Sequence, residues 1–165
     1  MKSSERKKSM SKAFKDFYPN GRLEVVGQYD DKGNQDGCWT KWYESGAKWG
    51  TINFRAGKRD GLCVEWYESG QLMTRATYKD SYPDGLFERW YENGQLLERS
   101  NWKDGIRDGL TEQWYENGKL DYRVNYKDGY RDGLYEERYK EDGRLRFRCN
   151  YKNGKPDDKS EEYWL

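Results

Sequence analysis

The side chains that could do chemistry in this chain are, first, glutamates that recur every 24 residues, at Glu88, Glu112 and Glu136. Two carboxyl groups held near each other could act as the acid and the base of glycoside hydrolysis. The strand pairing derived below, however, places an arginine on both sides of each glutamate. Because neighbouring cations favour the charged form of a carboxyl group, such a glutamate is a poor proton donor. We therefore expect these glutamates to be structural and the protein not to be an enzyme.

The other reactive side chains are three cysteines, Cys38, Cys63 and Cys149. They are odd in number, none has a close partner, and the chain contains no histidine. Disulfide frameworks and ordinary zinc sites are therefore not expected. The sequence also shows no nucleophile–base arrangement and no phosphate-binding glycine loop, so we predict no catalytic residue, no metal and no cofactor.

Two turn signals indicate the elements that position these residues. The tract Trp-Tyr-Glu-Ser/Asn-Gly begins at Trp42, Trp66, Trp90 and Trp114, and Asp-Gly keeps the same 24-residue step from Asp36 to Asp132. A period of this length is typical of solenoids and arrays of stacked units. Two turn signals per period imply two short strands per period. We therefore predict a repeat protein whose function lies in a surface.

The turn signal Asn93-Gly94 fixes a pairing register. It is typical of a two-residue type I′ hairpin, in which both central residues have positive φ. The flanking residues then pair as follows: Tyr91 with Leu96, Trp90 with Leu97, Glu88 with Arg99 and Gly85 with Trp102. The next connection brings Trp102 beside Gly109.

Two rows of side chains follow from this register. In the first, a ring alternates with a glycine, and a ring over a neighbouring glycine would cover its exposed backbone. This row reads Tyr29, Gly37, Phe54, Gly61, Tyr78, Gly85, Trp102, Gly109, Tyr126, Gly133, Tyr151. In the second, arginine alternates with glutamate: Arg75, Glu88, Arg99, Glu112, Arg123, Glu136, Arg148, Glu161. The turn was assigned without reference to charge, so this charge ladder is an independent check on the register.

Side chains alternate between the two faces of a strand, and the face with the charge ladder also carries an apolar row. That row consists of Trp42, Trp49, Trp66, Met73, Trp90, Leu97 and Trp114. Exposed apolar patches mark interfaces, and tryptophan supplies much of the binding energy there. We therefore predict a partner-binding surface at these seven residues. Two alternatives remain open: Phe14 and Phe17 could fold over the row, or curvature of the sheet could bury it.

Composition bounds the size of the core. Leu, Ile, Val and Phe together supply only 22 of 165 residues, whereas aromatic residues reach 17% and the net charge is +1. Disordered chains combine few aromatic residues with a large charge imbalance, so an ordered, thin, aromatic-rich β structure is expected. Residues 1–15 carry six basic residues against one acidic residue. We expect them to be disordered or a short helix, with the repeat domain at residues 16–165.

Blocks such as Trp114 to Leu120, followed by Asn125 to Gly129 and Asp132-Gly133, resemble the MORN-repeat variant of bacterial proteins commonly labelled as antitoxins of toxin–antitoxin systems. The likeness covers about residues 18 to 164. It implies an all-β fold, an elongated single-layer antiparallel β-meander of about 12 strands built from 24-residue MORN-like hairpin repeats.

This resemblance and the tryptophan row favour a non-enzymatic protein-binding protein, most concretely an antitoxin or immunity protein that covers a toxin. The alternative is a membrane- or lipid-associated scaffold, since MORN-type repeats also resemble lipid-binding modules, but the near-neutral body disfavours it. Carbohydrate stacking on the rings is a third alternative. Nucleic acid is not expected as a partner, because acidic residues outnumber basic ones outside residues 1–15. No apolar run reaches the length of a membrane span, so a cytoplasmic location is expected.

Overall fold

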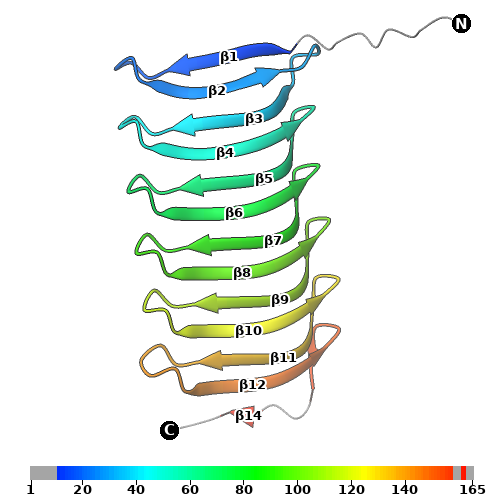
Figure 1. The fold of residues 1–165 in the computed structure, drawn as a ribbon. Helices are drawn as coiled ribbons and strands as arrows, with labels where there is room; N and C mark the ends of the chain where they lie inside the picture. Colours follow the sequence, from blue (N-terminus) through cyan, green and yellow to red (C-terminus); the bar gives the residue numbers. More distant parts are fainter. Residues whose placement is uncertain (1–10, 158–160, 163–165) are drawn as a thin grey trace, which may run out of the picture.

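The computed structural model describes residues 11–157 and 161–162, and these form one open antiparallel sheet (Figure 1). Its strands follow the order of the chain from β1 to β13, and β14 pairs with β12. The long strands are β1 (Lys12–Phe17), β2 (Leu23–Tyr29), β3 (Gln35–Trp42), β4 (Lys48–Arg55), β5 (Lys58–Trp66), β6 (Leu72–Lys79), β7 (Tyr82–Trp90), β8 (Leu96–Lys103), β9 (Ile106–Trp114), β10 (Leu120–Lys127), β11 (Tyr130–Arg138) and β12 (Leu145–Lys152). The short strands are β13 (Lys155–Pro156) and β14 (Glu161–Glu162).

The predicted single-layer antiparallel meander is confirmed, and the described ranges contain no helix. The predicted boundary at residue 16 needs a correction, because β1 begins at Lys12. A hairpin closed by Gly21 pairs Lys15 with Val26, so residues 12–15 form part of an edge strand and are neither helical nor disordered. The prediction for residues 1–10 lies outside the described residues.

The hairpin loops at Tyr-Glu-Asn-Gly are one residue longer than predicted. In the loop from Tyr91 to Gln95, the Gly94 N–H donates to the Tyr91 carbonyl at 3.0 Å, and the Tyr91 N–H donates to the Gln95 carbonyl at 2.8 Å. Gly94 has a φ of 84°, whereas Asn93 has no positive φ. The predicted type I′ turn is therefore wrong here. The loop is a three-residue turn that ends on a left-handed glycine.

A bulge beside each of these loops restores the predicted register. Trp90 pairs with Leu96, so Leu97 is left without a direct partner. From the next pair inward, the register is the predicted one, and Glu88 lies opposite Arg99. The extra loop residue and the bulged residue thus cancel each other.

Type I′ turns lie at the opposite edge of the sheet. Asp104 and Gly105 both have positive φ, 48° and 83°, and they join Lys103 to Ile106 as a two-residue hairpin. An Asp-Gly pair suits this turn because both central residues must be left-handed.

The tight turn changes the predicted row of rings and glycines. Trp102 lies opposite Gly85 on one side, as predicted, but opposite Arg107 on the other side, where Gly109 was predicted. Gly109 has a φ of 109°, and a Cβ atom there would meet Asn101 at 3.1 Å. Gly109 lies opposite Tyr126 as predicted, and its left-handed backbone gives a further reason for glycine here.

The core is one row of side chains that crosses the sheet at mid-strand. In order of pairing it reads Trp39, Ile52, Cys63, Ala76, Phe87, Ser100, Thr111, Val124, Tyr135, Cys149. Except for Phe87 and Tyr135, which are half-buried, each member is between 0 and 3% exposed. We call the side of the sheet that carries this row the core face. Rings on the same face cover it, as where Tyr29 lies 5.0 Å and Phe14 5.6 Å from the Trp39 ring.

The opposite side, which we call the ladder face, carries the predicted charge ladder. Its members pair in the predicted order from Arg75 to Arg148, and Glu161 lies opposite Arg148 in the backbone pairing. This part of the register prediction is confirmed.

The ion pairs of the ladder gather around two of its glutamates. Glu88 is bonded by Arg75 at 2.5 Å and Arg99 at 3.1 Å. Glu136 is bonded in the same way by Arg123 at 2.7 Å and Arg148 at 2.6 Å. Both carboxylates are at most 2% exposed. Glu112 lies opposite Arg99 and Arg123 but forms no ion pair within the described chain.

Each hairpin is also bonded to the next one at its two ends. At the loop end, the Tyr67 hydroxyl donates to the Trp90 carbonyl at 2.8 Å, and the Tyr91 hydroxyl donates to the Trp114 carbonyl at 3.0 Å. At the other end, the Gly105 N–H donates to the Pro83 carbonyl at 2.9 Å. Figure 1 shows these two-residue turns rising at the right edge toward the preceding hairpin. The Trp-Tyr-Glu-Asn-Gly tract therefore encodes a bond between repeats as well as a turn.

We predict that Tyr91→Phe destabilises the sheet by about 1 kcal/mol, the usual net value of one hydrogen bond. The substitution removes the hydroxyl that bonds the Trp114 carbonyl and keeps the ring. Urea unfolding followed by circular dichroism would measure the loss. Tyr130→Phe is the matched control, since Tyr130 is 62% exposed and its hydroxyl has no partner among the described residues. Equal midpoints for the two variants would contradict the prediction.

We also predict that Glu136→Gln destabilises the protein by about 2 kcal/mol at pH 7, because it weakens charged hydrogen bonds to two arginines. Burial acts to raise the pKa of Glu136, but hydrogen bonds from Arg148 and Arg123 outweigh it and hold the pKa below the ordinary value of 4.5. The wild type should keep this stabilisation above about pH 4.5 and lose it as the pH falls through the lowered pKa.

Urea midpoints measured between pH 3 and pH 7 would test this dependence. Glu136→Gln should flatten it, whereas Glu112→Gln should change stability by less than about 0.5 kcal/mol, because no ion pair is lost. Equal effects of the two substitutions would show that the ion pairs do not stabilise the ladder.

Candidate functional site

The bulges divide the seven predicted partner-binding residues between the two faces. Four tryptophans lie on the ladder face in direct pairs: Trp42 with Lys48, Trp66 with Leu72, Trp90 with Leu96 and Trp114 with Leu120. Trp49, Met73 and Leu97 are the bulged residues beside three of these pairs. The prediction of one seven-residue row is therefore wrong, because it assumed a loop one residue too short.

The tryptophans of the ladder face do not form a bare apolar patch. The Arg75 guanidinium lies 5.9 Å from the centre of the Trp90 ring, and the Lys48 amino group lies 4.8 Å from that of Trp66. Trp42, Trp66, Trp90 and Trp114 are all half-buried. Cationic side chains thus share this surface with the rings, in contacts of the cation–π type.

The bulged residues turn toward the core face. The Lys41 amino group, two residues from Trp39 of the core row, lies 5.5 Å from the centre of the Trp49 ring. Met73 lines a hollow together with Cys63, another member of the core row. Leu97 occupies the equivalent bulged position in β8.

Neither phenylalanine near the N-terminus covers the tryptophans of the ladder face. Phe14 contacts Tyr29 and Trp39 on the core face, with ring centres 5.4 and 5.6 Å apart. Phe17 is 54% exposed. The alternative in which these two side chains fold over the tryptophan row is therefore excluded.

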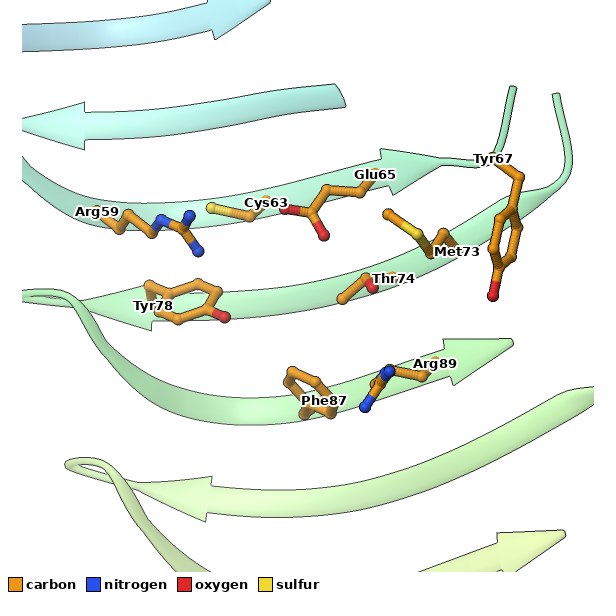
Figure 2. A pocket seen from close by; sticks show the side chains of 9 residues that line it. All are labelled: Arg59, Cys63, Glu65, Tyr67, Met73, Thr74, Tyr78, Phe87 and Arg89. Carbon is orange, nitrogen blue, oxygen red and sulfur yellow. The ribbon is translucent and has the colours of Figure 1, made fainter. Parts of the chain in front are cut away.

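The core face is hollowed between β5, β6 and β7 (Figure 2). We call this cavity, of about 290 Å³, the β5–β7 hollow. Its lining residues are Arg59, Cys63, Glu65, Tyr67, Met73, Thr74, Tyr78, Phe87 and Arg89. Figure 2 shows Met73 and Thr74 in its middle, with Tyr67 at the loop end and Arg59 and Tyr78 at the other end.

Small side chains on β6 create the hollow. Thr74 and Ala76 stand on β6 where the strand two repeats later, β10, carries Tyr122 and Val124. The Tyr122 ring fills that place and stacks on Tyr135, with ring centres 6.0 Å apart. A threonine in place of a tyrosine therefore leaves space beside Phe87, the counterpart of Tyr135.

The lining combines charged and apolar groups. The Arg59 guanidinium lies 5.4 Å from the centre of the Tyr78 ring. Arg89 is exposed, and Glu65 is half-buried on β5. Cys63 forms the floor at 3% exposure, and burial raises the pKa of its thiol. A thiol kept protonated is a weak nucleophile, so Cys63 acts here as a small apolar side chain.

Comparison with known families identifies the repeat. Residues 59–80, 83–104 and 107–128 match the MORN repeat variant. These three segments are MORN-variant repeats. The first two of them supply every residue that lines the β5–β7 hollow. No curated protein matches the chain.

Two glutamates of the charge ladder are surrounded by arginines. Glu88 is bonded by two of them, and Glu136 by two at hydrogen-bond distance with Arg138 at 3.8 Å; the pKa of Glu136 lies below its ordinary value. A carboxyl group held in its charged form is a poor general acid. Among the described residues, no three His, Cys, Asp or Glu side chains converge as metal ligands would. The same residues contain no helix that is long and apolar enough to cross a membrane.

We predict that Thr74→Tyr fills the hollow without unfolding the sheet. The MORN-variant repeat at residues 107–128 already holds a tyrosine at this position, stacked on its neighbour. The new ring should stack on Phe87, and the unfolding free energy should change by less than about 1 kcal/mol. Urea unfolding and the near-ultraviolet circular dichroism spectrum would measure both effects. A loss of several kcal/mol would show that the two repeats are not interchangeable here.

Proposed function

We propose that this protein is a non-enzymatic binding protein that holds a protein partner at the β5–β7 hollow. The observation that carries the proposal is the lining of the hollow. Arg, Tyr, Phe and Met surround one cavity, and aromatic and arginine side chains in a desolvated pocket supply most of the energy of protein interfaces. Because continuous strands and bonds between hairpins fix the backbone that carries these side chains, little backbone entropy is lost on binding.

The biological role that we prefer is that of an antitoxin or immunity protein, which binds a toxin in the cytoplasm and covers its working surface. Two observations support this role. Three segments match the MORN repeat variant, and the tracts quoted above resemble the form of this repeat in bacterial proteins labelled as antitoxins. The hollow is also suited to one inserted side chain of a partner. Such a partner would be neutralised by coverage alone, which requires no catalytic group in this chain.

A membrane-associated scaffold is the second candidate. Tyr82, Ile106 and Tyr130 recur at the two-residue turns and are 61, 50 and 62% exposed. Lysines stand in the same turns, so this edge combines rings with cations as membrane-surface segments do. Co-sedimentation with vesicles of anionic and of neutral lipid separates the candidates. Binding that requires anionic lipid would support the scaffold, whereas absence of binding to both would remove it.

Co-purification from the native host tests the proposed function. We expect a partner protein to remain bound to the wild type and to be toxic when expressed alone. Thr74→Tyr should weaken the complex by about 2 kcal/mol or more, since it fills the central pocket of the interface. Calorimetry or surface plasmon resonance with the purified partner would give the affinity.

Thr77→Tyr is the matched control, because Thr77 is an exposed residue of the same strand on the ladder face. It adds the same ring and should leave the affinity unchanged. Recovery of the free protein alone under several growth conditions would argue against the proposed function. Equal affinities for the two variants would place the interface elsewhere.

A further inference from the structure

The charged groups of the β5–β7 hollow lack ion-pair partners within the described chain. Arg59 contacts the Tyr78 ring but no carboxylate, and neither Arg89 nor Glu65 takes part in any ion pair. This differs from the remainder of the sheet, where Arg75, Arg99 and most other arginines of the strands are paired with an acid. Unpaired guanidinium groups beside a cavity are available to a ligand.

An internal comparison shows why Arg59 is unpaired. Its counterpart two repeats later, Arg107, bonds Glu98 at 2.7 Å, and Glu98 precedes it by nine residues on the neighbouring strand. The residue nine positions before Arg59, which is equivalent to Glu98, is Gly50. The carboxylate that neutralises Arg107 is thus missing at the hollow, while the guanidinium that it would bind is retained.

Arg89 also forms no ion pair within the described chain. Its cross-strand neighbours are Thr74 and Glu98. Thr74 carries no charge, and Glu98 accepts hydrogen bonds from Arg107 at 2.7 Å and from the Ser100 hydroxyl at 3.0 Å, both at its Oε1 atom. Arg89 stands exposed at the rim of the hollow and forms no ion pair with Glu98, which lies opposite it.

We infer that the β5–β7 hollow binds a carboxylate group carried on an apolar stretch of polypeptide. Arg59, beside Tyr78 at one end of the hollow, donates hydrogen bonds to the carboxylate, and Arg89 at the rim adds positive charge. Phe87, Met73 and Tyr78 contact the apolar neighbours. Two guanidinium groups against one carboxylate give the hollow a net charge of +1, which selects an anionic ligand. Glu65 accepts a hydrogen bond from a backbone N–H of the same stretch, since a polypeptide offers such donors at every residue.

The carboxylate could belong to an acidic side chain or to a chain terminus, and peptides separate the two sources. The inference rests on the proposed function only in assuming that the bound carboxylate belongs to a partner protein. The test therefore uses this protein with synthetic peptides and needs no partner. The probes are the acetylated and amidated tripeptides Leu-Asp-Leu and Leu-Asn-Leu, and acetylated Leu-Leu-Leu with a free or an amidated terminus. The readout is the nuclear magnetic resonance signal of the Arg59 and Arg89 Nε–H groups during titration.

We expect at least one carboxylate peptide to bind about threefold or more tightly than its neutral match, the range of a partly exposed ion pair. Arg59→Gln should remove this difference, and Glu65→Gln should increase it by removing a like charge. Lys41→Gln is the matched control, because Lys41 is an exposed cation on the core face in the same row as Glu65. It should leave the preference unchanged.

Equal affinity for the carboxylate and neutral peptides would overturn the inference, and so would an absence of binding by all four. An equal loss of preference in Arg59→Gln and Lys41→Gln would also overturn it, since the preference would then reflect the overall charge. These outcomes differ from failure of the proposed function. A toxin that is never recovered from the host leaves the peptide titration unaffected, and a toxin that binds without a carboxylate in the hollow refutes only the inference.

Discussion

A sheet of one layer must bury its core with side chains of the same sheet, and the rest of this structure depends on that constraint. The core row succeeds because most of its members are small. Ala76, Ser100, Thr111 and Cys149 are at most 1% exposed, while rings from neighbouring positions lie across them. A large member such as Trp39 is buried only because rings of the same sheet, Phe14 and Tyr29, cover it, since no second sheet or helix of the described chain does so. The low content of aliphatic residues therefore reflects the architecture, in which long-range burial is replaced by contacts between adjacent strands.

The register shows how far local sequence signals reach. The charge ladder was predictable because Arg99 and Glu112 alternate at a fixed step, and opposite charges pair across strands. The turn beside it was predicted with the wrong geometry, since Asn-Gly suits a type I′ hairpin when nothing else is known. The error did not propagate, because the bulge at Leu97 takes up the extra loop residue. The error did, however, assign the residues next to each loop to the wrong face of the sheet. Trp66 and Met73 were predicted on the same face, but Trp66 lies on the ladder face and Met73 turns toward the core face.

The remaining differences between prediction and structure have tertiary causes. Strand β1 was missed because the loop that follows it, Tyr18 to Gly21, departs from the repeat pattern. Phe17 precedes this loop where later repeats have Trp, and the next loop tyrosine, Tyr43, follows after 25 residues instead of 24. The β5–β7 hollow could not be predicted directly, since a cavity is defined by what its neighbours fail to fill. A signal was nevertheless present: the position of Thr74 carries Gly50, Glu98 and Tyr122 in the other repeats, so its side-chain volume varies. Aligning the repeats by side-chain volume would have indicated the place, although the wrong face assignment of Met73 would have obscured it.

The position of the hollow follows from how an array distributes its stability. Each hairpin is bonded to its neighbours by the same set of contacts, so a substitution in one repeat costs stability only there and at its two interfaces. Positions shared by all repeats, such as the loop tyrosines, are therefore constrained, whereas the positions at Gly50, Thr74 and Arg89 can vary. At the hollow, Thr74 stands where a later repeat has Tyr122, and Gly50 stands where a later repeat has Glu98. The absent ring leaves a cavity, and the absent carboxylate leaves the Arg59 guanidinium in its lining without an ion pair. Space and uncompensated charge in one place are what a binding site requires. A regular array can acquire them through two local substitutions without a change in its register.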